Sequence, residues 1–141
     1  MLTDGQIKAA VQAVNSEDDV WITDSALQGD LCISAGASCI NSVNTYPRIN
    51  LWRMIDPKGT YDEIYNRYAL ISVTPTSGKT SFESPGGSVV NMTLNLDDAR
   101  KLGVTKWMTT ADLSQFNTDK VRAEKVATVN AYTIWELVDV S

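Results

Sequence analysis

The sequence predicts an α/β domain of the α+β type, in which helices pack on a mixed β-sheet. In the N-terminal half, helix-periodic segments alternate with short apolar runs, which is typical of strands covered by helices. The C-terminal half is rich in strand-like segments separated by turn residues, which predicts hairpins. The 141 residues, 43% of them hydrophobic and 21% charged, suffice for one well-buried core. We therefore expect residues 1–141 to form a single soluble domain.

The first third of the chain is expected to alternate helix and strand. Thr3 can cap a helix whose apolar residues recur at helical spacing up to position 14. The apolar run Val20–Ile22 predicts a strand. Ser25 can cap a second helix, which Gly36 ends. A short strand is then expected at Cys39–Val43.

The middle of the chain is expected to hold two short helices around a turn. Residues 48–55 can form two helical turns. The turn is Asp56–Gly59, with the sequence DPKG, because proline and glycine favour turn conformations. A second short helix is expected at Tyr61–Asn66.

The next segments predict strands joined by tight turns. Alternating patterns indicate strands at Tyr68–Thr74, Thr80–Glu83 and Val89–Leu94, and this order predicts two hairpins in succession. Asn95 or Asp97 then opens a short helix.

The C-terminal segments complete the sheet. Gly103 is expected to end the preceding helix, and a strand follows at Val104–Met108. Thr109–Asp119 is polar and expected to be irregular. Lys120–Val129 and Ala131–Val138 predict a terminal hairpin around residue 130.

The composition excludes several classes of function. The net charge is −5 and the basic residues are scattered, which argues against nucleic acid as a partner. The chain contains no histidine, which removes the commonest general base and metal ligand. We therefore expect no catalytic residues, no metal site and no cofactor in these 141 residues.

Cys32 and Cys39 admit two interpretations. In an oxidising compartment they could close a small disulfide ring worth about 2 kcal/mol. The more common alternative is a pair of free, buried cysteines. A zinc site is disfavoured, because it would need two further soft or imidazole ligands that the chain lacks.

The aromatic and polar residues of the middle region give the candidate binding or interface site. Three of the four tryptophans lie in predicted strands and are expected in the core, whereas Trp52 stands on a short helix near a turn. Asn66 and Arg67 stand between two tyrosines, where an Arg fork could bind carboxylate or phosphate. The structural alternative is that Asn66 caps a helix and Arg67 pairs with a nearby acid. The candidate residues are Trp52, Asp56, Tyr65, Asn66, Arg67 and Tyr68.

No segment approaches the roughly 18 consecutive apolar residues that span a bilayer, and the N-terminus lacks the features of a signal peptide. Either the protein is cytoplasmic or the chain is a piece of a longer one.

A set of short motifs resembles a pattern in large polytopic bacterial membrane proteins, of the GT-C-type glycosyltransferase or YfhO-like kind. The motifs are Tyr46-Pro47, Leu51-Trp52, Ile55-Asp56-Pro57, Tyr65-Asn66-Arg67-Tyr68-Ala69, Gly103–Trp107 and Tyr132–Leu137. The resemblance covers most of the chain, but its motifs are not catalytic. It implies a soluble C-terminal domain on the extracytoplasmic face of the bacterial cell membrane.

The resemblance also implies a function. The domain would recognise an acceptor glycan or pack on the membrane portion of its own parent chain, whose donor would be a lipid-linked sugar. The parent could be an active membrane glycosyltransferase, and the domain alone would have no activity. The alternative is a free-standing cytoplasmic α/β binding or interaction module. An enzyme using only Asp and Lys would need those side chains to converge in one pocket.

Overall fold

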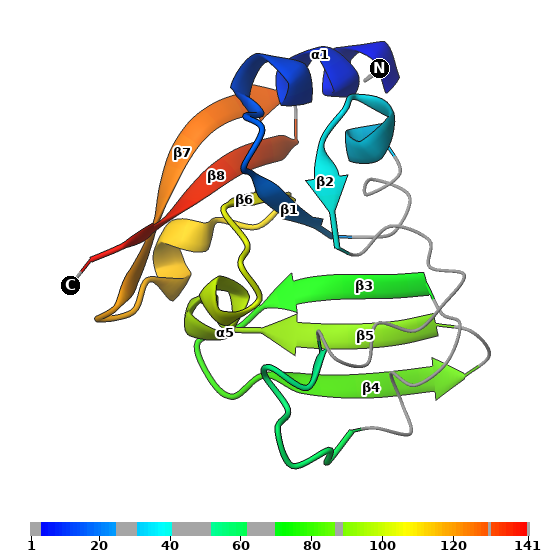
Figure 1. Ribbon diagram of the computed structural model, residues 1–141, viewed down its shortest axis with the longest axis vertical. Helices are drawn as coiled ribbons and strands as arrows, with labels where there is room; N and C mark the ends of the chain where they lie inside the picture. The colour runs from blue at the N-terminus through cyan, green and yellow to red at the C-terminus, as the bar shows by residue number, and fades with distance from the viewer. Residues whose placement is uncertain are drawn as a thin grey trace.

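A computed structural model describes residues 4–24, 31–40, 52–61, 70–86, 89–129 and 131–140. Within them the chain forms an α+β domain, as the sequence predicted, but its strands form two β-sheets and not the single mixed sheet that was expected (Figure 1). The helices are α1 (Asp4–Val14), α5 (Leu96–Lys101) and the short 3-10 helix η1 (Leu113–Phe116). The strands are β1 (Val20–Thr23), β2 (Ser38–Cys39), β3 (Leu70–Pro75), β4 (Ser81–Gly86), β5 (Val89–Leu94), β6 (Lys106–Thr109), β7 (Val121–Val129) and β8 (Tyr132–Asp139).

The larger sheet has five strands in the order β2-β1-β6-β8-β7. β1 pairs in parallel with β2 on one side and with β6 on the other. β6 pairs antiparallel with β8, which also pairs with β7 in the terminal hairpin. The sheet is therefore mixed, and the predicted terminal hairpin is confirmed.

The smaller sheet has the order β3-β5-β4, which corrects one sequence prediction. β4 and β5 form the expected antiparallel hairpin, but β3 pairs in parallel with β5 and not with β4. Val90, Met92 and Leu94 of β5 are all buried, as are Ile71 and Val73 of β3. β4 carries the exposed Glu83 and a proline, which suit an edge strand.

Two apolar clusters cover the two faces of the larger sheet. On one face, Trp107 and Trp135 pack in a cluster that also contains Val73, Val90 and Met92 of the smaller sheet. On the other face, α1 packs its apolar residues against the sheet in a second cluster. Figure 1 shows this layering, with α1 above the larger sheet and the smaller sheet below it. The second cluster consists of Ile7, Val11, Trp21, Cys32, Ala35, Ala37, Cys39, Met108 and Ile134.

Most predicted N-terminal and middle features match where the chain is described. α1 and β1 lie where the patterns placed them. Gly36 has a positive φ of 96° after a helical turn at residues 31–34. The turn at Asp56–Gly59 is closed by a bond from the Gly59 N–H to the Asp56 carbonyl, at 3.0 Å. The predicted helix at Tyr61–Asn66 and most of the strand at Cys39–Val43 lie outside the described residues.

Helix α5 begins and ends at the residues that its sequence indicates. The Asn95 side chain accepts a hydrogen bond from the Asp98 N–H at 2.8 Å, which caps the first turn. Gly103 follows the helix with φ of 87°, in the left-handed region that glycine adopts without strain. The cap and the glycine together confine α5 to two turns between β5 and β6.

Replacing Gly103 by alanine is expected to lower the free energy of unfolding by about 1–2 kcal/mol, because a Cβ disfavours positive φ. A Cβ at this position would meet nothing within 4 Å, so the loss isolates backbone strain. Gly78→Ala is the matched control, since Gly78 has no positive φ and a Cβ there would contact only the Thr76 hydroxyl, at 3.7 Å. Urea unfolding of both variants measures their free energies of unfolding. An equal loss of stability in Gly103→Ala and Gly78→Ala would contradict the explanation by backbone strain.

Candidate functional site

Trp52 is in the core, which corrects its proposed role in binding. Its side chain is fully buried and packs edge-on against Phe82, with ring centroids 6.1 Å apart. A sugar-stacking tryptophan must present a ring face to solvent, and Trp52 presents none. The short helix expected at residues 48–55 is helical at Trp52 and continues as a turn, which directs the indole inward.

Asp56 has a structural role. It is 7% exposed, and its carboxylate accepts the N–H groups of Thr60 at 3.1 Å and Tyr61 at 2.9 Å. These bonds satisfy backbone donors at the turn after Trp52. The other candidates, Tyr65, Asn66, Arg67 and Tyr68, lie outside the described residues.

Trp21, Trp107 and Trp135 are buried, as expected for core residues. Cys32 and Cys39 are both buried, and no disulfide bond joins them. Burial, with a smaller contribution from the neighbouring Cys39, raises the pKa of the Cys32 thiol to about 12. Cys32 is therefore a thiol at neutral pH and unreactive as a nucleophile.

A buried ion pair joins the start of β1 to β6. The Lys106 ammonium lies 3.0 Å from the Asp19 carboxylate and 3.5 Å from that of Glu136, and the Lys106 and Asp19 side chains are 7% and 8% exposed. Asp19 also accepts bonds from the Ser16 N–H and the Thr105 hydroxyl, each at 2.8 Å. Its hydrogen-bonding capacity is thus used within the fold.

The pKa of Asp19 reflects two opposing influences. Burial raises it, but the hydrogen bonds from the Ser16 backbone, Lys106 and Thr105 outweigh burial and hold it below its ordinary value. Asp19 is therefore ionised at neutral pH, and the pair fixes β1 against β6.

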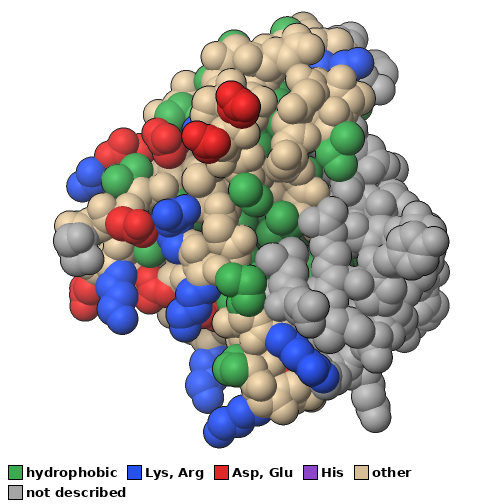
Figure 2. Space-filling model, viewed as in Figure 1, with side chains coloured by type: hydrophobic (Ala, Val, Ile, Leu, Met, Phe, Trp, Pro, Cys, Tyr) green, Lys and Arg blue, Asp and Glu red, His purple; other side chains and the backbone are tan. Residues whose placement is uncertain are grey.

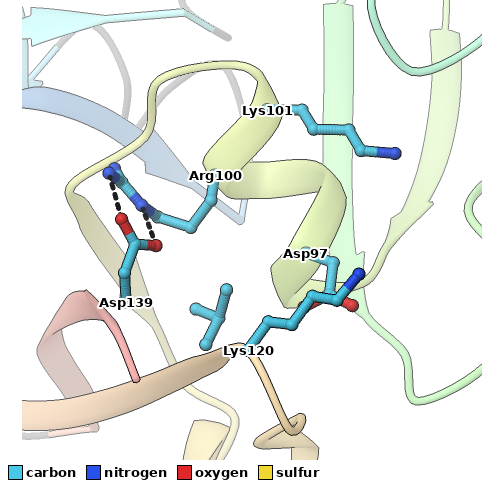
Figure 3. A pocket seen from close by; sticks show the side chains of 6 residues that line it. Asp97, Arg100, Lys101, Lys120 and Asp139 are labelled. Carbon is cyan, nitrogen blue, oxygen red and sulfur yellow. Dashed lines mark hydrogen bonds and ion pairs between the residues drawn. The ribbon is translucent and has the colours of Figure 1, made fainter. Parts of the chain in front are cut away.

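A groove of about 470 Å³ lies between α5 and the beginning of β7 (Figure 3). On the face seen in Figure 2, acidic and basic side chains lie side by side over this part of the surface. We call it the α5–β7 groove. It is lined by Asp97, Arg100, Lys101, Lys120, Val121 and Asp139.

One side of the groove is formed by an ion pair between Arg100 and Asp139. Its guanidinium donates to both carboxylate oxygens of Asp139, at 3.1 and 3.3 Å, and to the Val104 carbonyl at 2.8 Å. Figure 3 shows the two side chains meeting end to end. The hydrogen bonds and charge of Arg100 hold the pKa of Asp139 below its usual value. This fork fixes the position of Asp139, the last residue of β8.

The other side of the groove is less constrained. Asp97 accepts a hydrogen bond from the Thr118 hydroxyl at 2.5 Å, and Lys101 lies 3.5 Å from Asp98 at the surface. In the described part of the chain the Lys120 ammonium makes no hydrogen bond or ion pair, so its donors can meet a ligand. The groove therefore combines fixed and unengaged polar groups.

The chemistry of the α5–β7 groove suits binding. Carboxylates accept hydrogen bonds, lysine and arginine donate them, and Val121 adds an apolar contact. In the described ranges no group of three or more His, Cys, Asp or Glu side chains could hold a metal ion. Sequence reasoning missed this groove because its residues come from three distant segments. Asp97 was explained by its place at a helix start.

An apolar hollow of about 460 Å³ lies beside β2. Ile33 lines it and is 45% exposed, which is unusual for isoleucine. The remaining lining residues are Val20, Ala37, Ser38, Cys39 and Ile40.

Among the described residues, no helix has the length and apolar character needed to cross a bilayer. The model of one protein family, described as a domain of unknown function (DUF7654), matches residues 1–141. No curated protein and no solved structure matches the chain.

Proposed function

The chain belongs to the DUF7654 family, and from this premise we propose that it is a non-catalytic domain that recognises a glycan in the α5–β7 groove. Its parent is a polytopic bacterial membrane protein related to GT-C glycosyltransferases, and the domain lies on the extracytoplasmic face. The sequence motifs from Tyr46 to Ala69 support the assignment to a membrane-protein parent. The polar residues of the α5–β7 groove support a glycan as the ligand.

The mixture of fixed acceptors and unengaged donors is the observation that carries the proposal. Sugar hydroxyls both donate and accept hydrogen bonds, so they suit a site that offers carboxylates beside ammonium groups. Arg100 holds Asp139 in place before any ligand arrives, which lowers the entropy cost of binding. Lys120 then supplies charge-assisted bonds.

The charge balance of the groove favours an acidic glycan. Its three basic and two acidic side chains leave one net positive charge, on a chain whose net charge is −5. An acceptor that carries uronic acid or phosphate groups would pair with Lys120 and Lys101. In this role the domain binds the acceptor glycan, and the membrane portion of the parent binds the lipid-linked sugar donor.

The apolar hollow beside β2 supports a second candidate function, packing on the membrane portion of the parent chain. Ile33 is exposed there beside the partly buried Val20 and the buried Ala37 and Ile40, so the hollow offers an apolar surface on which another part of the parent could pack. Both functions can coexist, because the hollow and the groove have no residue in common.

Lys120→Ala is expected to weaken binding of an acidic oligosaccharide by about tenfold or more, since a charge-assisted hydrogen bond contributes about 1.5–3 kcal/mol. The measurement is titration of the ¹⁵N-labelled domain with a uronic-acid tetrasaccharide, with a neutral tetrasaccharide for comparison. Backbone amides of residues 97–101, 120–121 and 139 should shift.

Lys79→Ala is the matched control, because Lys79 is an exposed lysine on the loop between β3 and β4. It removes the same charge away from the groove and should leave the affinity unchanged. Equal weakening by both variants would show a nonspecific charge effect and contradict the proposal. Unaltered affinity in Lys120→Ala would contradict it as well.

A further inference from the structure

A second polar hollow, of about 210 Å³, lies where β1, β6 and β3 end. We call it the β1–β6 pocket. It shares no residue with the α5–β7 groove. Its lining residues are Asp24, Val73, Thr74, Pro75, Thr109, Thr110 and Ala111.

The topology of the larger sheet opens this pocket. β1 and β6 are parallel neighbours, with Thr23 opposite Met108. After β1 the next strand is β2, on one side of β1, whereas after β6 the next strand is β7, on the opposite side. The next strands after β1 and after β6 therefore lie on opposite sides of this pair in the sheet. Such a switch point leaves a crevice outside those ends, which is where open α/β sheets bind ligands.

Hydrogen bonds hold the Asp24 side chain at this switch point through one of its two carboxylate oxygens. Its Oδ2 accepts the Thr110 N–H at 3.0 Å and the Thr110 hydroxyl at 3.2 Å. Its backbone carbonyl accepts the Val73 N–H at 2.8 Å, which attaches Asp24, at the end of β1, to β3. Within the described part of the chain, Oδ1 accepts no hydrogen bond. Asp24 therefore presents a positioned acceptor to the pocket.

Thr109 adds a buried hydroxyl to the pocket. The side chain is 1% exposed, and its Oγ1 accepts the Ala111 N–H at 3.1 Å. The described contacts leave its hydroxyl hydrogen available as a donor. Among the described residues, no lysine or arginine lines the pocket, and Asp24 is the charged residue that these residues contribute.

We propose that the β1–β6 pocket binds a small hydroxylated primary amine, such as an amino sugar with a free amino group. The ammonium lies against Asp24 Oδ1, where it forms a charge-assisted hydrogen bond. A hydroxyl of the ligand accepts from Thr109, and Val73, Pro75 and Ala111 surround its carbon atoms. The volume is below the roughly 300–1,000 Å³ of drug-sized sites, which limits the ligand to about one sugar ring.

The test is titration of the ¹⁵N-labelled domain at pH 6 with glucosamine and, separately, with glucose. The two sugars differ at one position, so they isolate the ammonium group. Glucosamine is expected to shift the backbone amides of Asp24 and residues 109–111 with at least tenfold higher affinity than glucose. Equal affinity for the two sugars, or no shifts at these amides, would overturn the proposal.

Asp24→Asn is expected to weaken glucosamine binding at least tenfold and leave the fold intact, because the asparagine oxygen can still accept the bonds from Thr110. Glu83→Gln is the control, since it removes one negative charge at an exposed position of β4. Undiminished binding in Asp24→Asn would overturn the proposal.

Ala111→Leu provides a second variant that leaves Asp24 in place. Its larger side chain should fill part of the pocket and abolish the glucosamine shifts. Because neither variant alters the α5–β7 groove, binding of the acidic oligosaccharide should be unchanged in both. Retained glucosamine binding in a folded Ala111→Leu variant would place the ligand elsewhere.

Discussion

Replacing Lys106 by methionine is expected to lower the free energy of unfolding by about 3–5 kcal/mol. Methionine fills a similar volume, so the loss comes from the Asp19 carboxylate, which would stay buried without its cation. A domain of this size has a total stability of about 5–15 kcal/mol, so the variant should be close to unfolding at body temperature. Urea unfolding followed by tryptophan fluorescence measures the change.

Lys101→Met is the matched control for Lys106→Met. Lys101 also pairs with an aspartate, but its side chain is 63% exposed. Exposed pairs contribute about 0–1 kcal/mol, so this variant should be nearly neutral. Similar losses of unfolding free energy in Lys106→Met and Lys101→Met would mean that burial does not determine how much these ion pairs contribute to stability.

The effect of Lys106→Met should also depend on pH. The pKa of Asp19 is lowered in the folded state, so its contribution is fully present above the unfolded value and is lost as pH falls through the folded value. The stability difference between the native chain and Lys106→Met should therefore narrow at strongly acidic pH. A difference that stays constant down to pH 2 would exclude the ion pair as its source.

Trp52→Ala is expected to lower the free energy of unfolding by about 3–5 kcal/mol, because it leaves a large cavity beside Phe82. Trp52→Phe should cost less, since it retains an aromatic ring. Met54→Ala is the control, because Met54 is 52% exposed two residues away. Thermal unfolding of the three variants shows whether Trp52 stabilises the core, because a tryptophan that served only to bind a ligand could be replaced with little loss of stability. Unchanged stability in Trp52→Ala would contradict the core position.

The helices and strands of this fold could be predicted from the sequence wherever a few neighbouring residues determine where they begin and end. Asn95 and Gly103 define α5 because a cap and a positive φ are properties of a few neighbouring residues. The strand order of the smaller sheet could not be predicted from the sequence. Val89–Leu94 and Tyr68–Thr74 both alternate well, so the local pattern alone does not decide which of them lies between the other two strands.

The sites were harder to predict than the elements. Trp52 was singled out because it follows a break in the pattern, but the direction of its side chain depends on where Phe82 packs. The groove unites Arg100 with Asp139, 39 positions later, and no local motif marks either residue. Asp24 likewise meets Thr110 only because β1 and β6 become neighbours in the sheet.

The strand order of the larger sheet has a consequence for biosynthesis. β1 is made well before its partner β6 and the hairpin β7–β8, which come last among the strands of this domain. During translation the nascent chain therefore exposes the apolar faces of α1 and β1 until β6, β7 and β8 have emerged. Contacts between such distant segments also fold slowly, so the chain should depend on protection from aggregation while it is being synthesised.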